Sequence, residues 1–238
     1  MNVPLLYLDA VRRILDHFQS SQMEAVEQAA DRVVACLRRR GTVTCAAIGH
    51  GNEQDFLQRA GGLVALRSWA KTFPLQPTEE KGADADLEAI RRQVRGSDLK
   101  KGDVMLIGSV SGRNRAPVEL ALQCREMGVG VIAFTALTYS RRVTSAHPSG
   151  KRLFETADVV LDNGAPYGDA AVSVPGIAES MLPVSGVAMT VAGWLIWGRV
   201  MERMAAEGDA PSVYISVNRP DGPDWKARAL RQFEQRGY

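Results

Sequence analysis

The hydrophobic positions along the chain fall into two alternating patterns, which predict alternating helices and strands. Apolar residues recur at helical spacing up to Gly41, and again over 86–96 and 116–128. Between these segments lie short continuous apolar runs, typical of strands that are covered on both faces. The predicted strands fall within 42–52, 63–69, 103–109, 129–135 and 157–163.

This alternation predicts an α/β fold with helices on both faces of a parallel sheet, because parallel strands need crossover connections. We expect two helices before the sheet, the second opening with a capping box at Ser21–Glu24. A helix-like stretch covers 53–60, and a polar loop covers 72–86. The predicted organisation is an N-terminal helical arm over 1–40 that packs on the domain or on a dimer partner, one α/β domain over 41–218 and a C-terminal tail over 219–238.

One uncharged segment, 181–198, is long enough to suggest a membrane-spanning helix. It contains Pro183 and Thr190 as well as internal glycines, and no other segment of the chain resembles it. Trp194 and Trp197 lie three residues apart, as packing residues of a helix do. We therefore expect a buried helix of the core or of a subunit interface, and no membrane partner.

The composition is that of an ordinary globular protein, with 45% hydrophobic and 24% charged residues among 238. The formal net charge of +2 argues against nucleic acid as a partner. Three cysteines without a C-x-x-C pair are typical of a reducing cytoplasm, and the N-terminus has its arginines after its short apolar run, the reverse of a signal peptide. Three histidines without close His/Cys spacing predict no metal site.

The candidate chemistry lies where the strand within 103–109 runs into a helix, in the sequence GSVSGRN. Ser109 and Ser111 offer hydroxyl donors, Asn114 offers an amide, and Gly112 lets the backbone turn closely around a ligand. The helix that follows supplies free N–H groups and the positive end of its dipole, which favour an anion such as phosphate. The alternative is a turn whose serine and asparagine side chains only cap the helix.

Two common nucleotide sites are excluded by their motifs. No lysine follows Gly108 or Gly112 as a P-loop requires. The third glycine of a dinucleotide motif would fall at Gln54, and no acidic residue ends the second strand. We therefore expect no nucleotide cofactor, and no other cofactor is predicted.

Several stretches resemble the SIS (sugar isomerase) domain family, in particular a branch similar to phosphoheptose isomerase. They are GDVMLIGSVSGRN, GVGVIAFT, RAGGL and HPSGKRLFETADVVLDNGAPYGDA. The resemblance covers about 41–218. It implies a three-layer αβα sandwich with a five-stranded parallel sheet, a phosphorylated sugar as ligand, and a homodimer with its sites at or near the subunit interface.

The resemblance also implies roles for individual residues. Ser109, Ser111 and Asn114 would hold the phosphate, with Gly112 in the same loop. A turn after the first strand would close over the phosphate. This turn reads G-H-G-N, where the branch has a serine beside the glycine and histidine, so one hydroxyl is missing from the expected site. The residues of the turn are Gly49, His50, Gly51 and Asn52.

An aldose–ketose isomerase needs a carboxylate or an imidazole to move a proton between adjacent carbons. The candidates are Glu119, His50 and His147. Glu119 could instead be a dipole-favoured acid at a helix start, and His147 could lie in a surface loop. Ser185 is predicted to cap the long apolar helix or to contact the ligand. Residues at the rim of the site are expected to be Asp162, Asn163 and Asp169.

The sequence therefore predicts a cytoplasmic, homodimeric protein that binds a phosphorylated sugar and isomerises it. Two alternatives stay open. One is a sensor that binds the sugar phosphate without changing it. The other is a lyase or deaminase that removes a lactyl ether or an amino group from a hexosamine phosphate.

Overall fold

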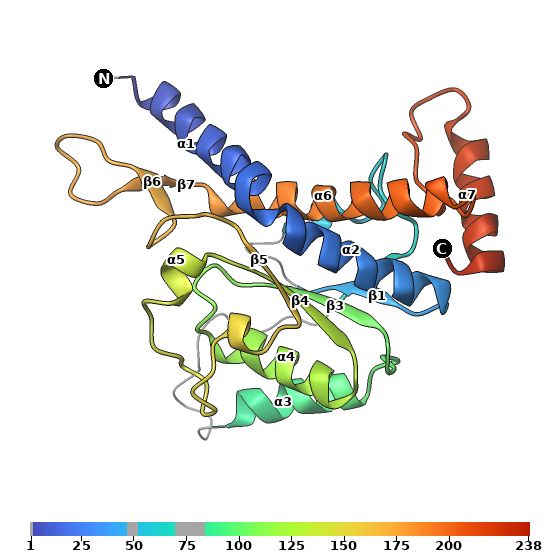
Figure 1. Cartoon of the computed structure of the whole chain (residues 1–238), viewed down its shortest axis with the longest axis horizontal. Coiled ribbons are helices and arrows are strands. Elements are labelled where there is room, and N and C mark those ends of the chain that lie inside the picture. The colour runs from blue at the N-terminus through green and yellow to red at the C-terminus, as the bar shows by residue number, and fades with distance from the viewer. Residues whose placement is uncertain (1, 47–51, 70–83) are drawn as a thin grey trace.

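A five-stranded parallel sheet forms the centre of the molecule (Figure 1). The computed structural model describes residues 2–46, 52–69 and 84–238. The strand order is β2-β1-β3-β4-β5, and each predicted strand segment contains one observed strand. The α/β prediction is thus confirmed. The strands are β1 (Val43–Cys45), β2 (Leu66–Ser68), β3 (Val104–Gly108), β4 (Gly130–Thr135) and β5 (Val159–Asp162).

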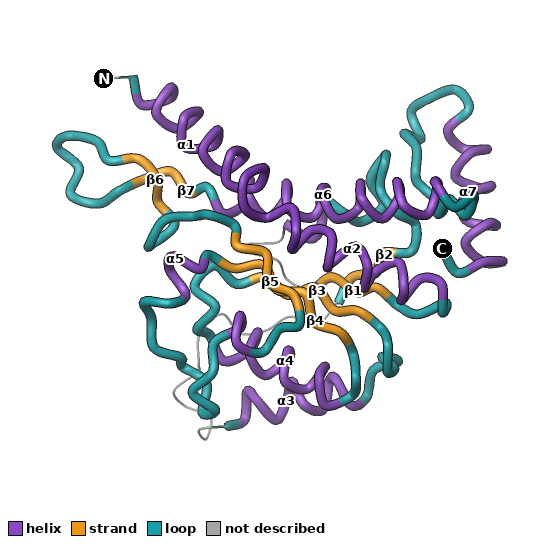
Figure 2. The backbone as a smooth tube through the Cα atoms, in the orientation of Figure 1, coloured by secondary structure: helices purple, strands orange, loops and turns teal. Residues whose placement is uncertain are grey.

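Both faces of the sheet are buried because successive side chains point to opposite sides. In β3, which pairs with β4 so that Leu106 lies opposite Ile132, Leu106 belongs to one apolar cluster and Met105 and Ile107 belong to another. Helices cover each cluster, which gives the predicted three layers (Figure 2). The first layer contains α1 (Val3–His17), α2 (Met23–Arg38) and α6 (Ser185–Ala206); the other contains α3 (Ala85–Arg95) and α4 (Arg115–Glu126).

The chain passes from α1 into α2 through a π-helical turn, Phe18–Gln22. The predicted capping box is wrong. The Ser21 hydroxyl donates to the His17 carbonyl oxygen at 2.8 Å, and Gln22, the N-cap of α2, makes no side-chain capping bond. The backbone stays helical across the junction, so α2 does not begin with a free helix start whose N–H groups a capping side chain would have to bind.

The long apolar segment is a buried helix, as predicted. Trp197 of α6 is 0% exposed. Among the described residues, no helix is long and apolar enough to cross a membrane. The first residues of the segment form β7 (Met181–Pro183), which pairs antiparallel with β6 (Ala170–Val172) in a hairpin that we did not predict.

The described segment that begins at Asn52 packs closely against α6. This segment is a short 3-10 helix, Asn52–Asp55, followed by turns, so the longer helix predicted over 53–60 is wrong. Phe56 is 0% exposed and packs edge-on against Trp194 and Trp197. A Cβ at Gly193 would lie 2.2 Å from the Phe56 ring, so only glycine allows this approach.

The C-terminal segment, predicted as a tail over 219–238, is mostly helical. It contains α7 (Gly222–Arg236), and the Tyr238 hydroxyl donates to Asp209 Oδ2 at 2.7 Å. At the other end, α2 lies on the sheet as part of its helical layer. The domain boundaries at 40 and 218 stay predictions. Two short helices complete the description, α5 (Leu137–Ser140) and a 3-10 helix (Leu153–Glu155).

Candidate functional site

The candidate site lies at the carboxyl edge of the sheet, where ligands gather in parallel α/β folds. Residues 109–114, called the serine loop below, connect β3 to α4 and lie at this edge beside the end of β4. The predicted contacts at Gly49, His50 and Gly51 lie outside the described residues. Asn52 begins the 3-10 helix after them.

The serine loop is tightly folded on its own chain. The Gly112 N–H donates to the Ser109 carbonyl at 3.1 Å, and Gly112 has a φ of +61°. A Cβ at Gly112 would lie 2.7 Å from Ser140 Oγ and 3.1 Å from Thr135 Oγ1. The glycine is therefore required by backbone conformation and by packing. We predicted a close approach to a ligand, whereas the approach that the structure shows is to the chain's own side chains.

Thr135 and Ser140, which the sequence analysis did not select, fix the backbone of the serine loop by hydrogen bonds. Thr135 and Ser140 are 0% exposed, and their hydroxyl oxygens are 2.7 Å apart. Thr135 donates to the Val110 carbonyl at 3.1 Å, and Ser140 donates to the Ser111 carbonyl at 2.8 Å. The only signal in the sequence is that a polar residue, Thr135, ends an apolar strand.

The polar side chains of the serine loop remain available to a ligand. Asn114 is the N-cap of α4 but makes no side-chain capping bond. Neither the Ser109 nor the Ser111 hydroxyl forms a hydrogen bond within the described part of the chain. Both residues are half-buried, so a ligand can still reach these hydroxyls. The capping alternative is therefore not what the structure shows. The hydroxyls and the start of α4 together resemble a phosphate site.

One arginine lies within the serine loop and a second follows it directly. Arg113 is exposed, and its Nε donates to the Thr144 carbonyl at 3.1 Å, which ties this positively charged loop residue to the 141–152 loop. Arg115 instead reaches across to α3, where it pairs with Asp84 at 2.9 Å and Asp86 at 2.8 Å. Arg113 was not among the predicted site residues, although it lies inside the GSVSGRN motif.

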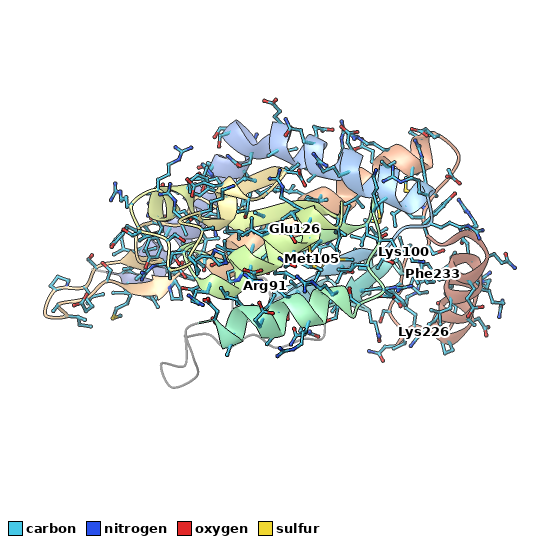
Figure 3. The ribbon with its side chains drawn as sticks, turned by 90° about the horizontal axis from the view of Figure 1, so that it is seen from below. Arg91, Lys100, Met105, Glu126, Lys226 and Phe233 are labelled. Carbon is cyan, nitrogen blue, oxygen red and sulfur yellow. The ribbon has the colours of Figure 1, made fainter. Side chains whose placement is uncertain are left out.

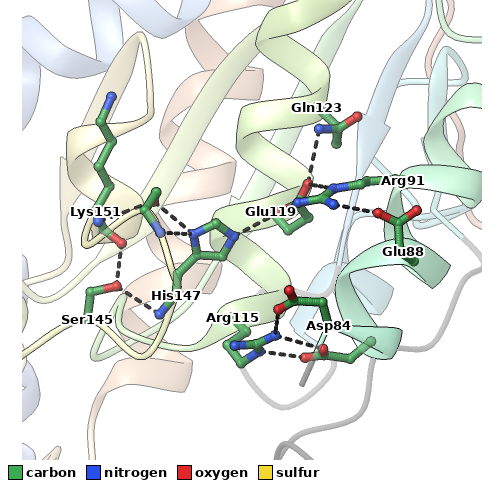
Figure 4. A network of polar contacts seen from close by, with 11 residues as sticks. Asp84, Glu88, Arg91, Arg115, Glu119, Gln123, Ser145, His147 and Lys151 are labelled. Atoms are coloured by element: carbon green, nitrogen blue, oxygen red, sulfur yellow. Dashed lines mark hydrogen bonds and ion pairs between the residues drawn. The ribbon is translucent and has the colours of Figure 1, made fainter. Parts of the chain in front are cut away.

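Glu119 and His147 lie in contact, which the sequence did not predict (Figure 4). His147 Nε2 is 2.8 Å from Glu119 Oε2. Arg91 Nε donates to Glu119 Oε1 at 2.8 Å, and Gln123 donates to the same oxygen at 3.0 Å. Glu119 is 1% exposed and His147 6%. The network joins the 141–152 loop to α3 and α4.

Burial and pairing act in opposite directions on the Glu119 carboxyl. Burial would raise its pKa, but the hydrogen bonds from Arg91 and His147 outweigh burial, so the pKa lies below its ordinary value. The second ring nitrogen of His147, Nδ1, lies 2.8 Å from Ser149 Oγ. Both nitrogens are thus engaged, and a catalytic role for Glu119 or His147 stays a prediction.

Ser185 begins α6, as predicted, but its hydroxyl is already used. It donates to Asp169 Oδ2 at 2.6 Å, and its N–H donates to Asp169 Oδ1 at 2.9 Å. Ser185 is 2% exposed. Asp169 therefore accepts the hydrogen bonds of the first residue of α6, and Ser185 is not part of the proposed ligand site. Asp162 similarly accepts from the Leu137 N–H at 2.9 Å, at the start of α5.

Neither a metal centre nor a reactive thiol is found among the described residues. Among the described residues, no three His, Cys, Asp or Glu side chains gather as a metal site would need. Cys36, Cys45 and Cys124 are buried free thiols. Burial raises the pKa of each thiol to about 12, so they stay protonated at neutral pH and are poor nucleophiles.

The comparisons with known proteins agree with the fold described above. A sequence model described as the SIS domain matches residues 6–136, which include most of α1, all of α2 and the serine loop. The chain belongs to the SIS domain family. UPF0309 proteins match this SIS-domain chain over nearly its whole length. One from Halalkalibacterium halodurans is 34% identical over 92% of each chain, and one from Listeria innocua is 31% identical over 97% of this chain and 95% of its own.

Solved structures share the SIS fold at low sequence identity. Phosphoheptose isomerase from Neisseria gonorrhoeae has a TM-score of 0.53 at 18% identity, covering 84% of this chain and 95% of its own. The enzyme from Francisella tularensis has a TM-score of 0.52 at 16% identity, covering 82% and 94%. The sugar isomerase domain of an RpiR transcription factor from Sphaerobacter thermophilus has a TM-score of 0.50 at 15% identity, covering 98% and 96%. These likenesses show the fold alone.

Proposed function

We propose that this protein binds a phosphorylated sugar at the carboxyl edge of its sheet, with the phosphate on the serine loop. The observation that carries the proposal is the state of Ser109, Ser111 and Asn114. Their side chains sit at the start of α4 without a capping role, on a backbone held by Thr135 and Ser140. The fold shared with two phosphoheptose isomerases supports a sugar as the rest of the ligand.

The proposed chemistry is aldose–ketose isomerisation, in which a base removes a proton from one carbon and returns it to the next. The proposed proton carrier is His50, which lies outside the described residues. Glu119 and His147 contribute in another way, because each is buried and bonded to the other. They position the 141–152 loop, whose Thr144 carbonyl accepts from Arg113 of the serine loop.

A sensor is the second candidate, and one observation favours it. The acid and the imidazole near the serine loop are engaged with each other and with Arg91, so neither offers a free base in the described structure. The fold shared with the sugar isomerase domain of a transcription factor is compatible with this role. A sensor would bind the sugar phosphate and release it unchanged.

The partner that we propose is a second copy of the chain. Leu5, Leu8 and Leu15 of α1 are 52%, 48% and 44% exposed, and α1 projects from the domain beside the β6–β7 hairpin (Figure 1). Substituting Leu8→Glu together with Leu15→Glu should convert a dimer into a monomer in size-exclusion chromatography with light scattering. Val217→Glu, at a residue 53% exposed near the other end of the chain, should leave the dimer intact. A wild-type monomer would contradict this proposal. The proposed compartment is the reducing cytoplasm, where the three buried thiols would stay unpaired.

Binding is tested first, by thermal-shift titration against a panel of sugar phosphates, with the unphosphorylated sugars as controls. A ligand at a hundred times its Kd stabilises the fold by about 2.7 kcal/mol, which for a chain of this size is a shift of several degrees. Ser109→Ala with Ser111→Ala should abolish the shift without lowering stability, since both hydroxyls lack partners. Ser173→Ala with Ser180→Ala, which removes an exposed pair of hydroxyls on the β6–β7 hairpin, is the matched control. If the first pair of substitutions leaves the shift unchanged, the phosphate does not lie on the serine loop.

Turnover then separates the candidate functions. An isomerase converts the bound aldose phosphate to the ketose, whereas a sensor leaves it unchanged even at high protein concentration. Release of lactate or ammonia would instead indicate a lyase or deaminase. Glu119→Gln should lower turnover through loop position and should leave phosphate affinity within a few-fold of the wild-type value.

A further inference from the structure

A cavity lies at the opposite edge of the sheet, where the strands begin. It has a volume of about 410 Å³, and its lining includes Arg32 and Arg39 of the α2 segment, Arg125 of α4, and the residues just before β3, β4 and β5. The two edges are separated by the length of the strands, and the six residues of β4 span roughly 20 Å. The cavity therefore does not belong to the serine loop site.

Most donors of the three arginines have no partner among the described residues. Arg39 Nη2 donates to the Gly102 carbonyl at 3.1 Å, and Arg125 Nη1 donates to the Thr156 carbonyl at 3.1 Å. Within the described residues, neither forms an ion pair. Arg32 lies 3.9 Å from Asp158, at the limit of an ion pair. A guanidinium has five donors, so each retains several that can meet an anion.

The carboxylates in the lining are engaged with the backbone. Asp103 accepts from the N–H groups of Thr42 and Lys100, each at 2.8 Å. Asp158 Oδ2 accepts from the Val131 N–H at 2.8 Å. These carboxylates thus fix the strand starts and only partly balance the arginines. Three positive and two negative groups line the cavity, which leaves it positively charged.

Two glycines allow cationic side chains to lie close to the backbone here, Gly102 for Arg39 and Gly128 for Lys101. A Cβ at Gly102 would lie 3.1 Å from Arg39 Nη2, and one at Gly128 would lie 2.9 Å from Lys101 Cγ. Both glycines have positive φ angles, +92° and +74°. Lys101 therefore adds another cationic side chain next to the lining.

Helix dipoles explain part of this arrangement but not all of it. Arg39 is the C-cap of α2 and Arg125 lies in the last turn of α4, where positive charge is favourable. Arg32 lies in the middle of α2, where no such benefit exists. A dipole role also does not account for the convergence of arginines from two helices on one cavity. Planar guanidinium groups from different directions match the oxygens of a phosphate.

We propose that this cavity, called the amino-edge site below, binds a small phosphorylated metabolite through Arg32, Arg39 and Arg125. The site is independent of the serine loop, so the protein holds two phosphate groups at opposite edges of one sheet. The volume suits a ligand of the size of a sugar phosphate.

The test uses inorganic phosphate as the probe and the double variant Ser109→Ala, Ser111→Ala as the background, so that the serine loop does not contribute. Phosphate should raise the thermal midpoint of this variant at an ionic strength held constant with sodium chloride. Adding Arg32→Gln or Arg125→Gln should weaken the apparent phosphate affinity at least tenfold. Adding Arg95→Gln, at an exposed arginine in the last turn of α3, removes the same charge and should change the affinity less than twofold.

Because Arg125 also bonds a carbonyl, its loss could lower stability, but Arg32 has no such bond, and only the phosphate-dependent part of the midpoint is compared. Crystals soaked in tungstate provide a second readout and should show an anomalous peak between the three arginines. Succinate, a dicarboxylate, is the control for binding of any dianion. The proposal is overturned if phosphate leaves the thermal midpoint of the background variant unchanged, or if succinate binds as well as phosphate. It is also overturned if Arg95→Gln weakens the phosphate affinity as much as Arg32→Gln, or if the tungstate peak lies away from the three arginines.

Discussion

The substitution Gly193→Ala tests how α6 supports the segment after β1. Gly193 lies inside a helix, where alanine is normally better than glycine by about 0.8–1.0 kcal/mol. Here the new Cβ would lie 2.2–2.8 Å from three atoms of the Phe56 ring, which is 0% exposed and packed against Trp194 and Trp197. Since the ring is enclosed, either the helix or the ring must move.

The expected cost follows from these contacts. Overpacking a core costs about 1–3 kcal/mol, and complete loss of a buried phenylalanine costs about 3–5 kcal/mol. If the ring partly moves aside, the cost of the clash lies between these values, at about 3 kcal/mol. Alanine regains about 1 kcal/mol of helix propensity, so we expect a net loss of about 2 kcal/mol in the free energy of unfolding. Phe56 lies four residues beyond Asn52, so the proposed sugar phosphate should also bind more weakly.

Gly198→Ala is the matched control, because a Cβ there meets nothing within 4 Å on the same helix. It should stabilise the protein by about 1 kcal/mol. Urea unfolding of the two variants should therefore separate them by about 3 kcal/mol, with unchanged m-values. If G193A is as stable as G198A, the packing of Phe56 against α6 described above is wrong. If G193A is destabilised but binds ligand normally, Phe56 does not position the proposed site.

Three further outcomes are expected. Gly112→Ala should weaken phosphate binding at least tenfold, because its Cβ meets Ser140 and Thr135, whereas Gly150→Ala, also at positive φ but with open space, should bind normally and lose only about 1 kcal/mol. Normal binding by G112A would contradict the described loop. Glu119→Gln should cost about 2–3 kcal/mol in urea unfolding, while the exposed Glu126→Gln on the same helix (Figure 3) stays within about 0.5 kcal/mol of wild type. The pKa of Glu119 in the folded protein lies below its ordinary 4.5. The stability difference between wild type and E119Q should therefore be complete above pH 4.5 and shrink as the pH falls through the folded pKa. A difference that is constant down to pH 2 would show that the carboxylate charge does not stabilise the fold.

The sequence alone determined the layered architecture. An apolar run such as that of β3 can be buried only if both faces of its strand are covered, so its pattern predicts helices on each side. The position of the serine loop was predictable for the same reason, because a polar turn between a buried strand and a helix must lie at the carboxyl edge of a parallel sheet.

Local signals failed where two local structures compete. The residues Ser21–Glu24 satisfy the pattern of a capping box, yet the Ser21 hydroxyl bonds back to His17 within a continuous helical backbone. Pattern reasoning counts the possible partners of a hydroxyl but not which of them the packed chain brings nearer. The β6–β7 hairpin was missed because β7 forms from the first residues of the apolar segment that the sequence analysis assigned to a single helix.

Only the tertiary structure decided which polar groups meet. Glu119 and His147 are 28 residues apart, and each could be given a separate role from its own neighbours in the sequence. The contact between them, the support of the serine loop by Thr135 and Ser140, and the gathering of arginines at the amino edge all depend on strand order and layer packing. Hydrophobic periodicity records which face of an element is buried, but it carries no information about which element lies against that face.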